Sequence, residues 1–196
     1  MYHEGNRFFQ DRFDTRRLAD RLEERLVLRA IDDEDKAFIE SRDMFFLATV
    51  DDEGQPNCSY KGGDPGFVSV VDERTIAFPN YDGNGMYLSI GNVWRNHAIG
   101  MLFIDWERPQ RLRVNGDAQV SFDDPLLARY HEAQFMVRVA VREVFPNCGR
   151  YIHRLKLIER SRFVPRAATP TPIPDWKRDM DRSVLSADDP LRREAP

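Results

Sequence analysis

A succession of short strand-like stretches between residues 44 and 145 most constrains the fold of this chain. Turn-rich or helical pieces separate them, such as the turn at Asp51-Asp52-Glu53-Gly54. Short strands that follow one another in this way are typical of antiparallel sheets, so the sequence predicts a mainly β protein with flanking helices and an antiparallel barrel. The predicted strands are Met44–Val50, Pro56–Lys61, Phe67–Val71, Thr75–Phe78, His97–Trp106, Arg111–Val120 and Phe135–Phe145.

The composition fits one folded domain with appended ends. A length of 196 residues and a hydrophobic fraction of 41% suffice for a core without covalent cross-links. The two cysteines, Cys58 and Cys148, form neither a disulfide framework nor a metal-ligand set, so we predict no metal site and a cytoplasmic location. A formal net charge of -4 with scattered arginines argues against nucleic acid as a partner, and no apolar run has the roughly 18 residues of a membrane span.

The two ends differ in composition from the predicted barrel. Residues 14–30 place leucines at helical spacing among many charges, which predicts an amphipathic helix, and Asp32 or Asp33 can cap a second helix. Prolines and charges dominate the last thirty or so residues, which predicts an extended arm or a disordered tail. We therefore expect an N-terminal helical segment at 1–43, a barrel at 44–165 and a proline-rich C-terminal arm or tail at 166–196.

Three separated segments each place a group that can bind an anion at the end of a strand-like stretch. This group is either a cation or a free backbone amide. The three segments could converge on one phosphorylated ligand. In the first of them, strand alternation puts Asn57, Ser59 and Lys61 on one face. The alternative is that Lys61 is an exposed strand-end lysine followed by an ordinary glycine loop. The segments are Asn57-Cys58-Ser59-Tyr60-Lys61-Gly62-Gly63, Phe78-Pro79-Asn80-Tyr81-Asp82-Gly83-Asn84-Gly85 and Gln110-Arg111-Leu112-Arg113-Val114-Asn115-Gly116.

The second segment precedes a stretch, Met86–Trp94, that is compatible with a short helix. Asn84, which follows Gly83, could be the N-cap of that helix, and the amides of its first turn would then form an anion site. The alternative is an ordinary helix cap without a ligand.

The third segment places Arg111 on the face away from the barrel interior, because it alternates with Leu112. A nearby stretch, Ala98–Ile104, is apolar on both faces of its pleat, which favours a homodimer. If two barrels pack through this face, Arg111 reaches a shared cleft. Otherwise it is a surface arginine paired with Asp105 or Glu107.

Catalytic motifs are weak. The sequence has no nucleophile elbow, no helical His-Glu pair and no Walker glycine loop, and its histidines lack metal-ligand spacing. If the ligand were haem, His153 would be the first choice for an axial ligand, with His97 the second. Catalytic residues are therefore left unassigned.

At residues 44–165 this order of segments resembles the pyridoxamine 5'-phosphate oxidase-like, FMN-binding split-barrel family. In that family a lysine ends the second strand, a turn opens a helix at the FMN phosphate, and a later polar residue reaches across the dimer. The matching positions are Lys61, Gly83-Asn84-Gly85 and Arg111. Two pieces are similar to a bacterial oxidase-related subgroup: Ser59-Tyr60-Lys61-Gly62-Gly63-Asp64-Pro65-Gly66-Phe67 and Tyr81-Asp82-Gly83-Asn84.

The departures from the family pattern argue against the vitamin-B6 oxidase itself. The Ser-Arg-Lys run that many of these oxidases place at the phosphate appears here as Gly83-Asn84-Gly85. Their C-terminal pyridoxal phosphate segment has no match either, since Trp176 lies in an unlike, proline-rich context.

The resemblance implies a six-stranded antiparallel split β-barrel that binds FMN as a homodimer. The implied function is an FMN-dependent oxidoreductase acting on a small molecule, in which hydride passes through flavin N5. Asn57, Ser59 and the backbone around Phe78-Pro79 would contact the flavin ring, whereas Lys61, Gly83, Asn84 and Arg111 would contact phosphate or ribityl. The alternatives are a non-catalytic flavin- or haem-binding sensor of the same fold and an interaction module without a ligand.

Overall fold

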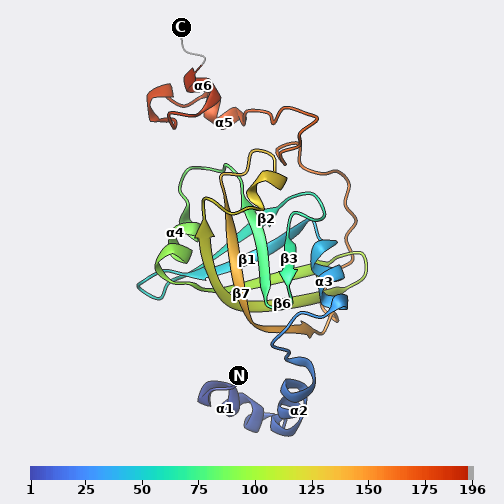
Figure 1. The fold of residues 1–196 in the computed structure, drawn as a ribbon. Coiled ribbons are helices and arrows are strands. Elements are labelled where there is room, and N and C mark those ends of the chain that lie inside the picture. The colour runs from blue at the N-terminus through green and yellow to red at the C-terminus, as the bar shows by residue number, and fades with distance from the viewer. Residues whose placement is uncertain (194–196) are drawn as a thin grey trace. The chain divides into compact units, whose positions relative to one another are not determined.

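The computed structural model describes residues 1–193, which divide into two compact units, one from Met1 to Glu159 and one beginning at Arg160. The first unit contains an antiparallel sheet with helices before it and a further helix inserted after the fourth strand (Figure 1). Its helices are α1 Glu4–Arg12, α2 Arg16–Leu26, α3 Asp33–Glu40 and α4 Leu88–Arg95, with a 3-10 turn η1 at Leu127–Arg129. Its strands are β1 Met44–Val50, β2 Pro56–Gly62, β3 Ser69–Asp72, β4 Thr75–Asn80, β5 Ala98–Asp105, β6 Gln110–Ser121 and β7 Phe135–Asn147.

The sheet has seven strands in the order β2-β1-β5-β6-β7-β4-β3, so the six strands expected for the barrel are corrected to seven. All neighbouring strands pair antiparallel, as predicted. The count includes β3, a four-residue edge strand that pairs only with β4. The predicted strand boundaries lie within two residues of the observed ones, because turns such as Asp51 to Gly54 interrupt the pairing where the sequence placed them.

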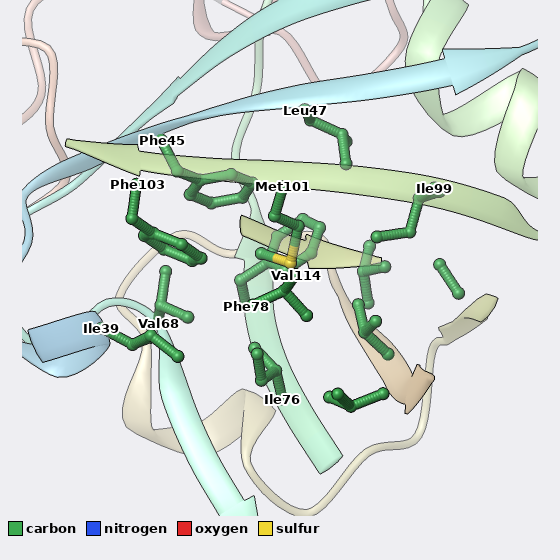
Figure 2. Close-up of a cluster of buried hydrophobic side chains, with 14 of the residues drawn as sticks. Ile39, Phe45, Leu47, Val68, Ile76, Phe78, Ile99, Met101, Phe103 and Val114 are labelled. Carbon is green, nitrogen blue, oxygen red and sulfur yellow. The ribbon is translucent and has the colours of Figure 1, made fainter. Parts of the chain in front are cut away.

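The sheet curls around one apolar core (Figure 2). Phe45 on β1 and Phe78 on β4 are well separated in the strand order, yet their ring centroids lie 5.1 Å apart. Phe103 on β5 approaches Phe45 to 5.3 Å. All three side chains are buried, and burying a phenylalanine stabilises a fold by about 1.5–3 kcal/mol. Strand alternation therefore aims one face of each strand into this core and leaves the other face outside.

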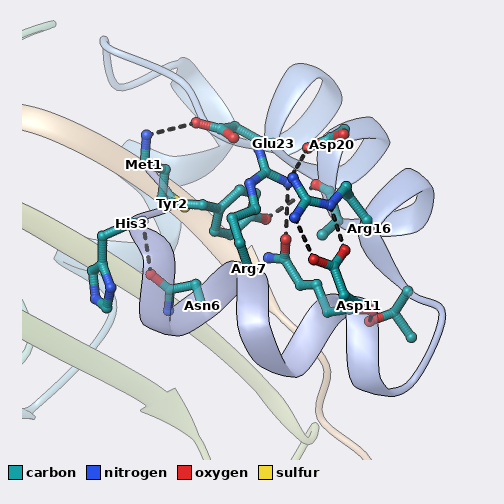
Figure 3. Close-up of polar contacts among 12 residues, drawn as sticks. Met1, Tyr2, His3, Asn6, Arg7, Asp11, Arg16, Asp20 and Glu23 are labelled. Atoms are coloured by element: carbon teal, nitrogen blue, oxygen red, sulfur yellow. Dashed lines mark hydrogen bonds and ion pairs between the residues drawn. The ribbon is translucent and has the colours of Figure 1, made fainter.

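The N-terminal region contains two helices where the sequence predicted one over residues 14–30. Asp14 adopts a left-handed conformation with φ 51°, and this bend separates α1 from α2. Ion pairs join the two helices: Arg7 with Asp20 and Arg16 with Asp11, both at 2.5 Å (Figure 3). The next helix, α3, begins as predicted after Asp32, whose Oδ1 accepts a hydrogen bond from the amide of residue 35 at 2.8 Å.

The second unit, beginning at Arg160, includes the segment predicted as an extended arm or a disordered tail, and it contains short helical turns. They are α5 Asp175–Arg178, η2 Arg182–Val184 and α6 Pro190–Arg193. A buried ion pair between Lys177 and Asp189, at 2.8 Å, holds them beside the buried side chains of Leu185 and Leu191. Within residues 1–193, no helix is both long and apolar enough to cross a bilayer.

Candidate anion-binding cavity

A cavity of about 430 Å³ lies between β2, the loop after β4 and the first turn of α4. This volume falls within the range of small-molecule sites, roughly 300–1,000 Å³. Two of the three segments singled out in the sequence meet here. The lining residues are Asn57, Cys58, Ser59, Lys61, Asn80, Tyr81, Gly83, Asn84, Gly85, Tyr87, Leu88, Ser89 and Ile90.

Strand β2 supplies the polar wall of the cavity. Asn57, Ser59 and Lys61 alternate along the strand and are partly buried, whereas Cys58 and Tyr60 between them are exposed. The hydroxyl oxygen of Ser59 is buried and has no hydrogen-bond partner among the described residues. A buried polar atom without a partner costs about 1–3 kcal/mol, so Ser59 fits a wall that a polar ligand completes.

Lys61 supplies the positive charge of the cavity. Its Nζ donates a hydrogen bond to Ser89 Oγ on α4 at 3.0 Å. Burial lowers the pKa of Lys61 below its ordinary value of 10.5, because the charged form loses hydration. Within residues 1–193 no carboxylate lies within ion-pair distance of this ammonium, and no aspartate or glutamate lines the cavity. An anionic ligand would therefore find a cation that no protein group already neutralises.

The loop after β4 differs from the prediction in one respect. Asn84 is not the N-cap of α4, because the helix begins at Leu88 and its N-cap is Tyr87. Gly85 takes φ +76° and Tyr87 takes φ 50°, and two such bends cannot belong to a helix. The side chain of Asn84 instead accepts a hydrogen bond from the amide of Met86 at 3.0 Å, which stabilises the turn.

The start of α4 faces the cavity with Leu88, Ser89 and Ile90. The first amides of a helix have no partner inside it and carry partial positive charge. They therefore add to the attraction that Lys61 exerts on an anion.

A hydrogen-bond network joins two residues that line the cavity, Asn80 and Tyr87, through Gln134. Gln134 Oε1 accepts from Asn80 Nδ2 at 2.9 Å and from the hydroxyl of Tyr87 at 3.1 Å. Tyr81 also lines the cavity, and burial raises its pKa to about 12. Tyr81 therefore presents a neutral phenol ring to a ligand near neutral pH.

The structure brings five of the eight predicted cofactor-binding residues to the cavity: Asn57, Ser59, Lys61, Gly83 and Asn84. Phe78 and Pro79 on β4 do not line it, because both are buried and Phe78 packs in the apolar core.

Arg111 also lies apart from the cavity within one chain. Strand alternation puts it outside the core, since its neighbour Leu112 is buried, as predicted. Its Nη2 donates to Asn147 Oδ1 at 2.6 Å, and its buried Nε has no partner in the described part of the chain. The predicted alternative partner Asp105 pairs instead with Arg42 at 2.9 Å.

The two histidines considered as axial ligands do not line the cavity. His97 contacts the carbonyl oxygen of Ala118 at 3.2 Å, and His153 is exposed. Residues 1–193 contain no group of three or more potential metal ligands.

The sequence reasoning missed Tyr81, Tyr87 and Ser89 as lining residues. Tyr81 stands inside a segment that had been singled out, so only its role was overlooked. Ser89 was missed because the predicted helix began at Met86, two residues before the observed start.

A family model described as pyridoxamine 5'-phosphate oxidase matches residues 31–159. The chain therefore belongs to this family, as its sequence indicated. No protein of curated function matches it.

Solved structures with a similar fold include three of differing description. A putative pyridoxamine 5'-phosphate oxidase from Lactobacillus delbrueckii is 24% identical, covers 60% of this chain and 95% of its own, and has a TM-score of 0.49. A haem storage protein from Vibrio cholerae is 19% identical, covers 59% of this chain and 93% of its own, and has a TM-score of 0.45. An FMN-binding protein from Syntrophomonas wolfei is 14% identical, covers 72% of this chain and 97% of its own, and has a TM-score of 0.40.

Proposed function

We propose that this protein is an FMN-dependent oxidoreductase whose cavity holds the phosphate end of the flavin at Lys61. The observation that carries the proposal is the half-buried ammonium of Lys61, which faces a cavity without acidic lining residues and has no carboxylate partner in the described chain. A phosphate monoester carries between one and two negative charges near neutral pH and matches this environment.

Other features of the cavity support a phosphorylated, partly aromatic ligand. The first-turn amides of α4 add donors beside Lys61, and the unpartnered hydroxyl of Ser59 lies on the same wall. Tyr81 and Tyr87 offer aromatic surface to the same cavity. The cavity is thus polar and cationic along β2 and α4 and aromatic along the loop after β4.

Bound FMN supplies hydride transfer, and the protein has to bind and orient it. No general acid or base is needed for that transfer, which agrees with a cavity lined mainly by amide, hydroxyl and aromatic groups. The substrate is a small molecule in this proposal, and the location is the cytoplasm.

The protein acts as a homodimer in this proposal. Strand pairing aligns Tyr60, Phe46 and Leu102 across β2, β1 and β5 on the outer face of the sheet. Tyr60 is 62% exposed there, and the neighbouring Ala48 is exposed as well. Arg111 also points outside the core, so a second copy packed on this face would bring Arg111 towards the partner's cavity.

Titration with FMN tests the proposed ligand. Lys61→Ala should weaken FMN binding by about 1.5–3 kcal/mol, because one charge-assisted contact to the phosphate is lost. Riboflavin, which lacks the phosphate, is the control ligand and should bind both proteins equally. Fluorescence quenching of the flavin measures both dissociation constants. Equal FMN affinity of the two proteins would remove Lys61 from the site.

A further inference from the structure

The hydroxyl of Ser89 is the one side-chain partner of Lys61 among the described residues. The two residues come from different elements, the end of β2 and the first turn of α4, and both line the cavity. Ser89 is 6% exposed, so its position is fixed by the packing of α4. The contact therefore joins a rigid helix to a long and flexible side chain.

A lysine ammonium is a compact charge on a four-carbon stem with three N–H donors. One donor of Lys61 is used by Ser89, and two remain for a ligand. Without the contact, the stem could take other rotamers and the charge would move away from the α4 amides. The contact also stabilises the charged form, which burial disfavours.

We propose that Ser89 is a positioning residue, which holds the ammonium of Lys61 in the cavity beside the first turn of α4. This inference rests on the proposed function for its ligand, the phosphate of FMN. Ser89 acts through Lys61, so its contribution to binding disappears when Lys61 is absent.

A double-mutant cycle on FMN affinity tests the inference. Ser89→Ala should raise the FMN dissociation constant about tenfold in the wild-type background, since one hydrogen bond to a charged group is lost. In the Lys61→Ala background the same change should alter it less than about twofold. Ser89→Thr, which keeps the hydroxyl, should restore most of the affinity. Equal effects in both backgrounds would contradict a role through Lys61.

Ser69→Ala is the matched control. Ser69 is also buried, and its hydroxyl contacts Tyr130 at 2.9 Å rather than any residue of the cavity. Its substitution should leave the FMN dissociation constant within about twofold of wild type. A loss as large as that of Ser89→Ala would assign the effect to general destabilisation and overturn the inference.

A measurement without FMN separates this inference from the proposed function. NMR titration of protein labelled at the lysine side chains follows the pKa of Lys61 directly. Ser89→Ala should lower that pKa further, because the charged form loses its acceptor. If the wild type does not bind FMN, the proposed function fails, but the inference is still decided here. An unchanged Lys61 pKa in Ser89→Ala would contradict it.

Discussion

At the scale of residues, the β2 side chains of the cavity were predictable, whereas on α4 the helix start was predicted and the side chain of Ser89 was not. Alternation along a strand is a local property, so Asn57, Ser59 and Lys61 could be assigned to one face from sequence. Whether Ser89 lies in the first turn of α4 depends on where this helix begins. The positive φ angles of Gly85 and Tyr87 prevent the helix from beginning before Leu88. The contact between Ser89 and Lys61 could not be predicted from sequence spacing, because the two residues belong to distant segments that only the fold brings together.

One residue had a different role from the one expected. Gly63 ends the first of the three segments predicted to bind an anion, yet it is buried and does not line the cavity. A Cβ at this position would lie 2.4 Å from Cγ of Phe67. The glycine is therefore required by the packing of Phe67, and any larger side chain would displace that ring.

Arg111 gives the prediction at this scale. If it reaches the partner's cavity across the dimer, Arg111→Ala should weaken FMN binding about tenfold and also loosen the dimer. Flavin titration and sedimentation equilibrium measure the two effects. Arg74→Ala, at an exposed turn between β3 and β4, is the control and should change neither. Unaltered affinity together with an unaltered dimer would remove Arg111 from a shared cleft.

At the scale of elements, strands were predicted better than helices. Turn residues lie at the ends of the strands, and strands such as β6 carry apolar residues at alternate positions; both signals are local. Helix α1 was missed because its apolar residues are exposed and it buries none of its side chains. Ion pairs hold α1 against α2, and such contacts between two segments cannot be predicted from the sequence of either segment alone.

Helix α3 gives the prediction at this scale. Burial, and then the neighbouring carboxylates of Asp32 and Glu34, raise the pKa of Asp35 from 3.8 to about 6. The folded state binds a proton on the Asp35 carboxyl group more tightly than the unfolded chain does. The stability that this proton provides is therefore present at low pH and is lost as the pH rises from about 4 through about 6.

Asp35→Asn should therefore raise the free energy of unfolding by about 1–2 kcal/mol at pH values above this window and leave it nearly unchanged below. Urea denaturation at two pH values, one on either side of the window, measures this difference. Asp33→Asn, an exposed neighbour in the same turn, is the control. A gain for Asp35→Asn that is equal at both pH values would contradict the assignment.

At the scale of the whole molecule, local patterns predicted the seven strands of an antiparallel sheet but not their order within it. The strand order brings β7 between β6 and β4, and such pairing joins residues far apart in the chain. The edge-to-face contact between Phe45 and Phe78 likewise results from curling of the sheet, which no single strand encodes. The resemblance to a known family predicted the arrangement of the sheet as a barrel, but the six strands that it implied are corrected to seven.

In the proposed function, the cavity between β2 and α4 is a flavin site. The most direct test is the visible absorption spectrum of the purified protein before and after addition of FMN, with mass spectrometry of any ligand released on denaturation. We expect a flavin spectrum and the mass of FMN. A haem Soret band with released haem, or a colourless protein that does not change when FMN is added, would contradict the claim.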